Sequence, residues 1–298
     1  MAKNMVQIWF LQIRGSFLIL SVMLVLIGIA TAGYDGTWHW GHSILLLFGV
    51  VLTHVSVNLF NELSDFHTKI DENTTRTPFS GGSGLLQAGL TSCRSVRLAA
   101  YTALSVSGFI GIYFCVTSGW LIAVFMLIGG LAICFYTTHF AKIVLGEFIS
   151  GLTLGSCVVM GVYYALVKEL TVPVVMVSVP PGLLTSLLLF LNEFPDMEAD
   201  EAGGRRHLVI MLGRSASAKI YAVLLAVLYL IIGLNPIFFQ IPRITWIAFL
   251  TLPVALRAAV IVLKEYDHTD RLIPALGMNV IMVLLTDLLF AVAYFISS

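Results

Sequence analysis

Nine long apolar segments divide this sequence, and they restrict its fold more than any other feature. A helix needs about 20 mostly apolar residues to cross the hydrocarbon core of a bilayer. Such segments lie near residues 16–33, 42–64, 95–117, 120–137, 144–167, 172–194, 217–235, 244–263 and 272–296. Only helices and closed barrels satisfy their backbone hydrogen bonds in lipid, and apolar runs this long exclude barrel strands. We therefore predict an all-α integral membrane protein with nine transmembrane helices.

The overall composition excludes a water-soluble fold. Hydrophobic residues make up 59% of the chain and charged residues only 11%, whereas soluble domains contain roughly 25% charged residues. The formal net charge is zero, which gives no indication of a nucleic-acid partner. The four cysteines have no CxxC spacing and are not paired with histidines in a zinc-binding pattern, so we predict no zinc site and no disulfide framework.

The placement of positive charge predicts the orientation of the helices. Of the sixteen Lys and Arg residues, only Lys168 and Arg243 fall in loops on one side of the membrane, and Arg257 falls inside a helix. Loops rich in Lys and Arg stay in the cytoplasm. We therefore expect a cytoplasmic N-terminus and two long cytoplasmic loops, near 65–94 and 195–216. The protein should be a multi-pass protein of the cell membrane whose polar site faces the cytoplasm.

The second apolar segment ends in a cluster of polar side chains. The string NExxD begins at Asn61 and ends at Asp65. Residues four apart share a helix face, and Asn58 lies on roughly the same stripe. Asp71 follows six residues after Asp65, where the helix is expected to give way to a loop.

The same string occurs again at the end of the sixth apolar segment. Here Asn192, Asp196 and Asp200 are spaced four and four, which again places them on one helix face. One such helix end alone fits a solvated terminus equally well. Two matching ends on the same side of the membrane favour a shared site.

Facing carboxylate clusters repel each other unless a cation lies between them. Mg²⁺ suits oxygen ligands and typically takes one or two carboxylates together with substrate phosphates. The nearby bases Lys142, Arg205 and Arg206 could bind diphosphate oxygens. The residues therefore predict a Mg²⁺-dependent site for a strongly anionic leaving group.

With these motifs the chain resembles the UbiA superfamily of intramembrane prenyltransferases over nearly its whole length. The resemblance rests on the two acidic strings, on GGRRHLVIMLGR and on FYTTHFAKIVLGEF at residues 135–148. It implies a single membrane domain over residues 1–298, with the helices bundled around a central cavity. It also implies transfer of a prenyl group from an isoprenoid diphosphate to an acceptor that is often aromatic.

The resemblance assigns roles to individual residues. It implies that Mg²⁺ is held by four carboxylates, which are Asp65, Asp71, Asp196 and Asp200. Binding of the donor's diphosphate would involve Lys142, Arg76, Arg205 and Arg206, with Asn58, Asn61 and Asn192 orienting ligands. Tyr136 and Glu147 belong to the segment that resembles the family's Tyr-rich loop. All of these residues are read from the motif positions of this sequence.

The acceptor is the open question within this interpretation. The RTPFSGGSG loop and the spacing from Asp65 to Asp71 look closest to dihydroxynaphthoate prenyltransferases of menaquinone synthesis. Hydroxybenzoate, a homogentisate-like ring, a tetrapyrrole or a glycerol phosphate lipid remain alternatives. A secondary transporter is the rival class, although carriers usually place their polar site near the middle of the bilayer.

Three polar residues inside apolar segments could have either a functional or a structural role. Asp287, Arg257 and His54 are functional candidates because ionisable groups inside membranes are costly. We favour a buried structural role for Asp287 and a packing role for His54, whereas Arg257 could either extend its side chain toward the interface or help to bind a substrate.

Overall fold

The computed structural model describes residues 4–70, 74, 76–135 and 146–298, and within these residues every regular element is a helix and no strand occurs. The predicted all-α class is therefore confirmed. The elements in chain order are α1 (Met5–Gln12), η1 (Gly15–Phe17), α2 (Leu18–Tyr34), α3 (Trp40–Thr68), α5 (Cys93–Ser118), α6 (Leu121–Phe135), α7 (Gly146–Ser150), the π-helical η3 (Gly151–Ser156), α8 (Cys157–Val167), α9 (Val172–Ala202), α10 (Leu208–Phe238), the 3-10 helix η4 (Arg243–Thr251), α11 (Leu252–Glu265) and α12 (Thr269–Ser297).

Eight helical stretches of the described chain are long and apolar enough to cross a membrane. They are Gly15–Tyr34, Trp40–Thr68, Cys93–Ser118, Gly146–Val167, Val172–Ala202, Leu208–Phe238, Arg243–Glu265 and Thr269–Ser297. The segment predicted at 120–137 corresponds to α6, whose described apolar part is the shorter Leu121–Ile133. The protein is thus a multi-pass membrane protein, and a count of nine spans stays a prediction.

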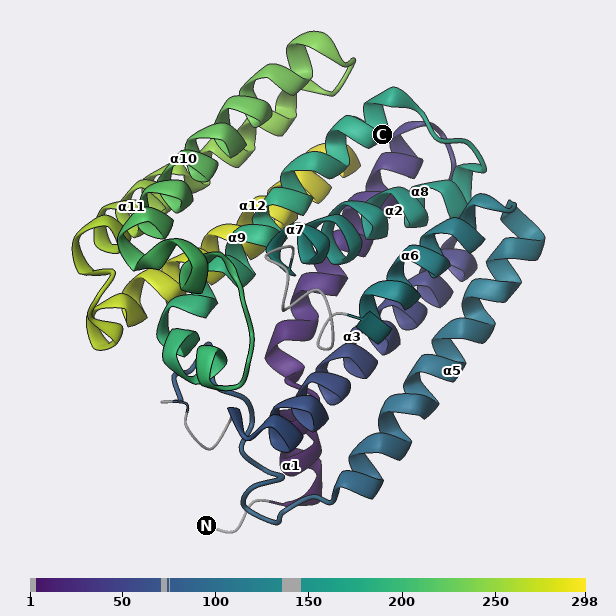
Figure 1. Ribbon diagram of the computed structural model, residues 1–298. Coiled ribbons are helices and arrows are strands. Elements are labelled where there is room, and N and C mark those ends of the chain that lie inside the picture. The colour runs from purple at the N-terminus through teal and green to yellow at the C-terminus, as the bar shows by residue number, and fades with distance from the viewer. Residues whose placement is uncertain (1–3, 71–73, 75, 136–145) are drawn as a thin grey trace.

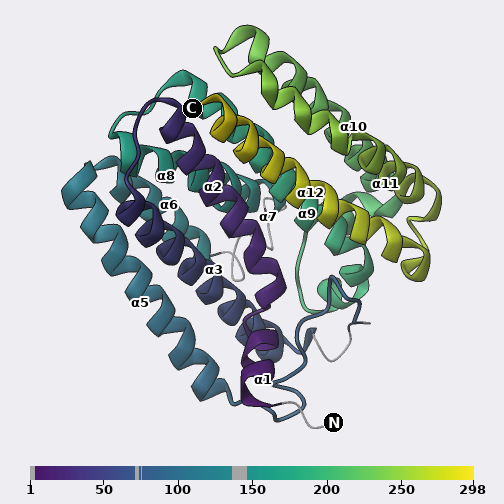
Figure 2. The ribbon, with the colours of Figure 1, turned by 180° about the vertical axis from the view of Figure 1, so that it is seen from behind.

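The long helices lie side by side in one bundle (Figure 1). Helix α5 lies at one side of the bundle and α10 and α11 lie at the other, as the view from behind also shows (Figure 2). The N-terminus, the connection from α3 to α5 and the connection from α9 to α10 share one end, and the C-terminus lies at the opposite end. Apolar side chains of α5 such as Phe109 and Val116 are 72% and 82% exposed, as expected of a surface that faces lipid.

The helices that carry the acidic strings continue beyond their apolar segments. Helix α3 ends at Thr68, before Lys69 with its left-handed φ of 59°, and α9 ends at Ala202, before the Gly203-Gly204 pair. Both strings therefore lie within regular helix rather than in loops. The helical backbone therefore places residues four apart on one face, as the sequence predicted.

Two prolines in the middle of α9 are accommodated by polar groups of neighbouring helices. Pro180 has no N–H to bond the carbonyl four residues earlier, that of Met176. Asn235 of α10 donates its Nδ2 hydrogen to this carbonyl at 2.9 Å. Ser156 of η3 donates to the carbonyl of Ser178 at 2.9 Å. Asn235 thus replaces the hydrogen bond that Pro180 removes, as backbone groups in lipid require, and Ser156 gives the Ser178 carbonyl a further side-chain partner.

Glycines let η3 approach α9 at backbone contact. A Cβ added at Gly155 would lie 2.6 Å from the Cα of Gly182 and 2.8 Å from the carbonyl oxygen of Pro181. Close contact through small residues is the usual means by which membrane helices associate. This contact positions the start of the η3–α8 segment, and with it the neighbouring α7.

Replacing Gly155 with valine is therefore expected to destabilise the protein. Overpacking of a tight interface costs about 1–3 kcal/mol, and here the atoms in the way belong to the backbone, which yields least. The midpoint of thermal unfolding in detergent measures the effect. Gly108→Val is the matched control, because a Cβ at Gly108 meets nothing within 4 Å. Equal midpoints for the two variants would contradict the role of this contact.

The three polar residues inside the apolar segments have different surroundings. Arg257 is exposed on α11. Asp287 of α12 is 0% exposed, and neither of its carboxylate oxygens has a hydrogen-bond partner within the described part of the chain. His54 is buried, with its Nδ1 2.7 Å from the Oγ of Ser21. Of the three, His54 alone lines the cavity described next.

Candidate active site

A cavity of about 340 Å³ lies between α3 and α9, at the place where the two acidic strings end. Helix α3 contributes Asn58, Asn61 and Asp65 to its wall. The facing wall comes from α9 and consists of Asn192, Glu193, Asp196 and Asp200. Away from this polar part the lining is apolar and includes Leu20, Val50, Ala132, Ile133, Leu154, Val158 and Leu188. The cavity thus joins a charged region to a hydrophobic one.

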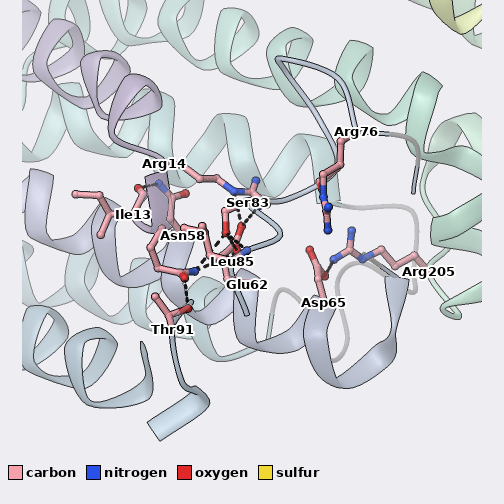
Figure 3. Close-up of polar contacts among 12 residues, drawn as sticks. Ile13, Arg14, Asn58, Glu62, Asp65, Arg76, Ser83, Leu85, Thr91 and Arg205 are labelled. Carbon is pink, nitrogen blue, oxygen red and sulfur yellow. Dashed lines mark hydrogen bonds and ion pairs between the residues drawn. The ribbon is translucent and has the colours of Figure 1, made fainter. Parts of the chain in front are cut away.

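Arg205 connects the two acidic strings. Its guanidinium donates one hydrogen bond to Asp65 of α3 and another to Asp200 of α9, the latter at 2.9 Å. Figure 3 shows the guanidinium of Arg205 directed at the carboxylate of Asp65. A cation therefore lies between the two carboxylates, as their mutual repulsion requires.

Two oxygens of the α9 wall have no partner among the described residues. Asn192 Oδ1 and Asp196 Oδ1 are buried, and neither accepts a hydrogen bond there. Buried oxygens without partners are costly and rare in native structures. Together with Asp65, Asp200 and Asn61 they form a set of carboxylate and amide oxygens, which is the ligand type that Mg²⁺ takes. The residues present therefore fit a magnesium ion.

The remaining residues predicted from the sequence do not line the cavity or lie outside the described part of the chain. Asp71, Tyr136 and Lys142 lie outside the described residues. Arg206 is exposed and does not line the cavity. Arg76 belongs to the loop above the site, where its Nε donates to the carbonyl of Gly81 at 3.2 Å. Figure 3 shows Arg76 above the Asp65–Arg205 pair, although it is not part of the cavity lining.

Glu62, the acidic residue at the second position of the first string, is buried outside the cavity lining and only 1% exposed. Its carboxylate accepts hydrogen bonds from Gln12 Nε2 at 3.2 Å and from Arg14 Nε at 3.1 Å. It also accepts two from Ser83, one from the backbone N–H at 2.8 Å and one from the hydroxyl at 2.5 Å. Figure 3 shows these bonds converging on the carboxylate. Glu62 thus joins α3 to the N-terminal segment and to the loop that covers the site.

A second buried group, formed by Glu147, Glu193 and His207, adjoins the acidic strings, and only Glu147 was among the residues named from the sequence. His207 lies with its Nε2 3.3 Å from Asp200 Oδ2 and its Nδ1 3.5 Å from Glu193 Oε2. Glu147 of α7 accepts a hydrogen bond from the backbone N–H of Leu208 at 2.8 Å. Glu193 and His207 line the cavity. The signal available in the sequence was the glutamate that follows the asparagine in both NExxD strings.

Arg14 is another cavity-lining residue that the site prediction omitted. Because it also pairs with Glu62, its position is fixed by the same buried carboxylate that secures the loop. Its side chain is 27% exposed, which leaves the guanidinium accessible from the cavity mouth. It adds a second arginine to the mouth beside Arg205.

The chain was compared with known families, proteins and structures. The model described as the UbiA prenyltransferase family matches residues 21–282. The 1,4-dihydroxy-2-naphthoate octaprenyltransferase of Bacillus subtilis is 26% identical over 193 residues, which cover 63% of this chain and 61% of that protein. The enzyme of the same name from Escherichia coli is 25% identical over 307 residues, covering 98% of this chain and 96% of that one. A UbiA homologue from Archaeoglobus fulgidus, bound to DMAPP and Mg²⁺, has the same fold with a TM-score of 0.68 at 14% identity, covering 97% of this chain and 98% of that one.

Proposed function

The chain belongs to the UbiA prenyltransferase family, and on that premise we propose that it transfers a prenyl group from an isoprenoid diphosphate to dihydroxynaphthoate, in a Mg²⁺-dependent reaction. The observation that carries the proposal is the meeting of the two NExxD strings across one cavity. Their carboxylates, with Arg205 between them, form a site for an anionic group at the edge of an apolar space. This is the arrangement that a substrate with a diphosphate head and a hydrocarbon tail needs.

The proposed magnesium ligands are Asp65, Asp196 and Asp200, together with Asp71, whose placement the structure does not describe. When bound there, Mg²⁺ supplies a Lewis acid that neutralises charge on the diphosphate leaving group. The Archaeoglobus fulgidus homologue, which has the same fold and is bound to DMAPP and Mg²⁺, supports the use of a magnesium ion. So do the unpartnered oxygens of Asn192 and Asp196 on the cavity wall.

The positive side chains at the mouth are proposed to bind the diphosphate. Arg205 and Arg14 line the cavity, and guanidinium groups bind phosphate oxygens through two parallel hydrogen bonds. Arg76 and Lys142 are proposed to assist from the covering loop and from the segment before α7. These groups stabilise the negative charge that grows on the diphosphate as the bond to the prenyl carbon breaks.

The apolar part of the cavity is proposed to hold the reacting prenyl carbons and the acceptor ring. Its aliphatic walls exclude water, which would otherwise quench an allylic cation. His54 is one of the polar side chains that line the cavity, and its contact with Ser21 holds it in place. Dihydroxynaphthoate is favoured as the acceptor by the names of the two bacterial relatives, at 25–26% identity.

The arrangement in the membrane is part of the same proposal. We take the whole chain as a single prenyltransferase domain with nine spans, in which α6 completes the ninth. The N-terminus and the site are proposed to face the cytoplasm at the cell membrane, because Lys and Arg gather in the connections at that end.

A direct assay tests the proposal. The purified full-length protein is incubated with Mg²⁺, a radiolabelled prenyl diphosphate and dihydroxynaphthoate, and the lipid product is extracted. A labelled product that disappears with EDTA supports both the reaction and the acceptor. Product with another ring, such as hydroxybenzoate, but none with dihydroxynaphthoate would overturn the acceptor while keeping the reaction. The absence of product with every acceptor of the panel would overturn the proposed reaction.

A further inference from the structure

Three buried side chains beside the acidic strings have the composition of a metal site. Glu147, Glu193 and His207 each place one potential ligand atom within 4.8 Å of the other two. They are 4%, 7% and 4% exposed. Glu147 comes from α7, Glu193 from α9 and His207 from the residue before α10, so three separate elements converge on one point. The packing of η3 against α9 helps to bring the first of them there.

The polar atoms of this cluster are not satisfied by the protein that surrounds them. Glu147 Oε2, Glu193 Oε2 and both ring nitrogens of His207 are buried without a hydrogen-bond partner among the described residues. In the same part of the chain, neither glutamate forms an ion pair with a lysine or an arginine. Two adjacent buried carboxylates without a cation are strongly unfavourable. Among the described residues, therefore, no lysine or arginine neutralises the two glutamates, and His207 is their ionisable neighbour.

We propose that Glu147, Glu193 and His207 bind a divalent transition-metal ion of the Zn²⁺ type, separate from the magnesium held by the aspartates. An imidazole nitrogen with two carboxylates suits Zn²⁺, Fe²⁺ or Mn²⁺, whereas Mg²⁺ prefers oxygen ligands alone. Three protein ligands would leave further coordination positions to water. The ligand atoms are Glu147 Oε2, Glu193 Oε2 and the Nδ1 of His207, which faces Glu193.

The surroundings of the three ligands match those of a metal site. The other oxygen of Glu147 accepts the Leu208 N–H at 2.8 Å, which fixes the carboxylate's direction. With Nδ1 bound to the metal, the hydrogen of His207 resides on Nε2 and points to Asp200 Oδ2, 3.3 Å away. Metal-bound histidines commonly donate their second ring hydrogen to a carboxylate in this way. The metal would thus hold His207, and through it Asp200, in place beside the magnesium site.

Metal binding here does not depend on the proposed prenyl transfer. The proposal follows from the type of the three ligands, their burial and their lack of hydrogen-bond partners among the described residues. Metal binding can be measured in protein that has no substrate. Failure of the transfer assay and failure of metal binding are therefore separate results.

The test uses the full-length protein in detergent, stripped with a chelator and then kept in excess Mg²⁺ to fill the aspartate site. Co²⁺ replaces Zn²⁺ as a spectroscopic probe, and bound metal per chain is measured by its visible absorption and by elemental analysis. We expect one tightly bound equivalent in the wild type. Glu193→Gln and His207→Gln should reduce it to background; the glutamine at 207 can still donate to Asp200 but lacks the Nδ1 ligand.

Asp196→Asn is the matched control, because it alters the aspartate site and leaves the three ligands intact. It should retain the Co²⁺ equivalent. Size-exclusion profiles establish that each variant is folded. The proposal is overturned if the wild type binds no Co²⁺ in excess Mg²⁺. It is equally overturned if Asp196→Asn abolishes binding while His207→Gln preserves it, because the ion would then occupy the aspartate site.

Discussion

Replacing Asp196 with asparagine is expected to lower the rate of prenyl transfer by at least about a hundredfold, the scale seen when one electrostatic contact to a transition state is removed. Asp196 lines the cavity, and its Oδ1 is buried without a partner among the described residues. Asparagine has nearly the same shape but no charge, so it is a weak ligand for Mg²⁺. The rate is measured with labelled donor over a range of Mg²⁺ concentrations.

The same change should leave the free energy of unfolding unchanged or raise it. Asp196 Oδ1 is buried without a hydrogen-bond partner among the described residues, which makes the charge of this carboxylate costly in the folded state, and asparagine removes that charge. A loss of activity without a loss of stability is expected when a residue serves function rather than folding. Glu198→Gln is the control two residues further along α9, because its side chain is 68% exposed and pairs with Arg214 outside the cavity lining. A near-normal rate for Asp196→Asn, or a loss of rate that follows unfolding, would contradict the assignment.

Replacing Glu62 with alanine is expected to cost about 3–5 kcal/mol of folding free energy, the range for removing one partner of a buried charge pair. The change leaves Arg14, Gln12 and the Ser83 N–H without their shared acceptor. It also releases the covering loop from α3. Thermal or denaturant-induced unfolding in detergent measures the loss.

The control for this second prediction is Glu198→Ala, which breaks an ion pair of which one partner is largely exposed. Such pairs contribute about 0–1 kcal/mol. Similar losses for the two variants would show that the Glu62 contacts do not hold the loop. A large loss for Glu62→Ala alone would show that this position, though part of the acidic string, is structural.

The spacing of residues along one helix was predictable because it depends only on local geometry. The interval of four from Asn61 to Asp65 and again from Asn192 to Asp196 requires no knowledge of the rest of the fold. The apolar segments stop near 64 and 194, where polar side chains begin, whereas the four-residue spacing predicted that the helices extend through those polar residues. The backbone continues as a helix through those polar residues to Thr68 and Ala202.

Contacts between distant parts of the chain were not predictable in the same way. Glu62 meets Gln12, Arg14 and Ser83, which are 50, 48 and 21 residues away, and no periodicity marks such partners. The approach of Glu147 to the residue before α10 likewise depends on how η3 packs against α9. The length criterion is confirmed for eight spans, whereas the described apolar part of α6, Leu121–Ile133, is shorter than a bilayer requires, so the ninth span stays a prediction.

The bridge from Arg205 to Asp65 has a consequence for biosynthesis. The two residues are 140 positions apart. At about 5–20 residues per second, a ribosome adds 140 residues in roughly 7–28 s (140/20 to 140/5). During that interval α3 is already made, but the carboxylate of Asp65 cannot yet bind Arg205. The newly made first half of the chain thus lacks this bridge between the two acidic strings until the end of α9 and the start of α10 leave the ribosome.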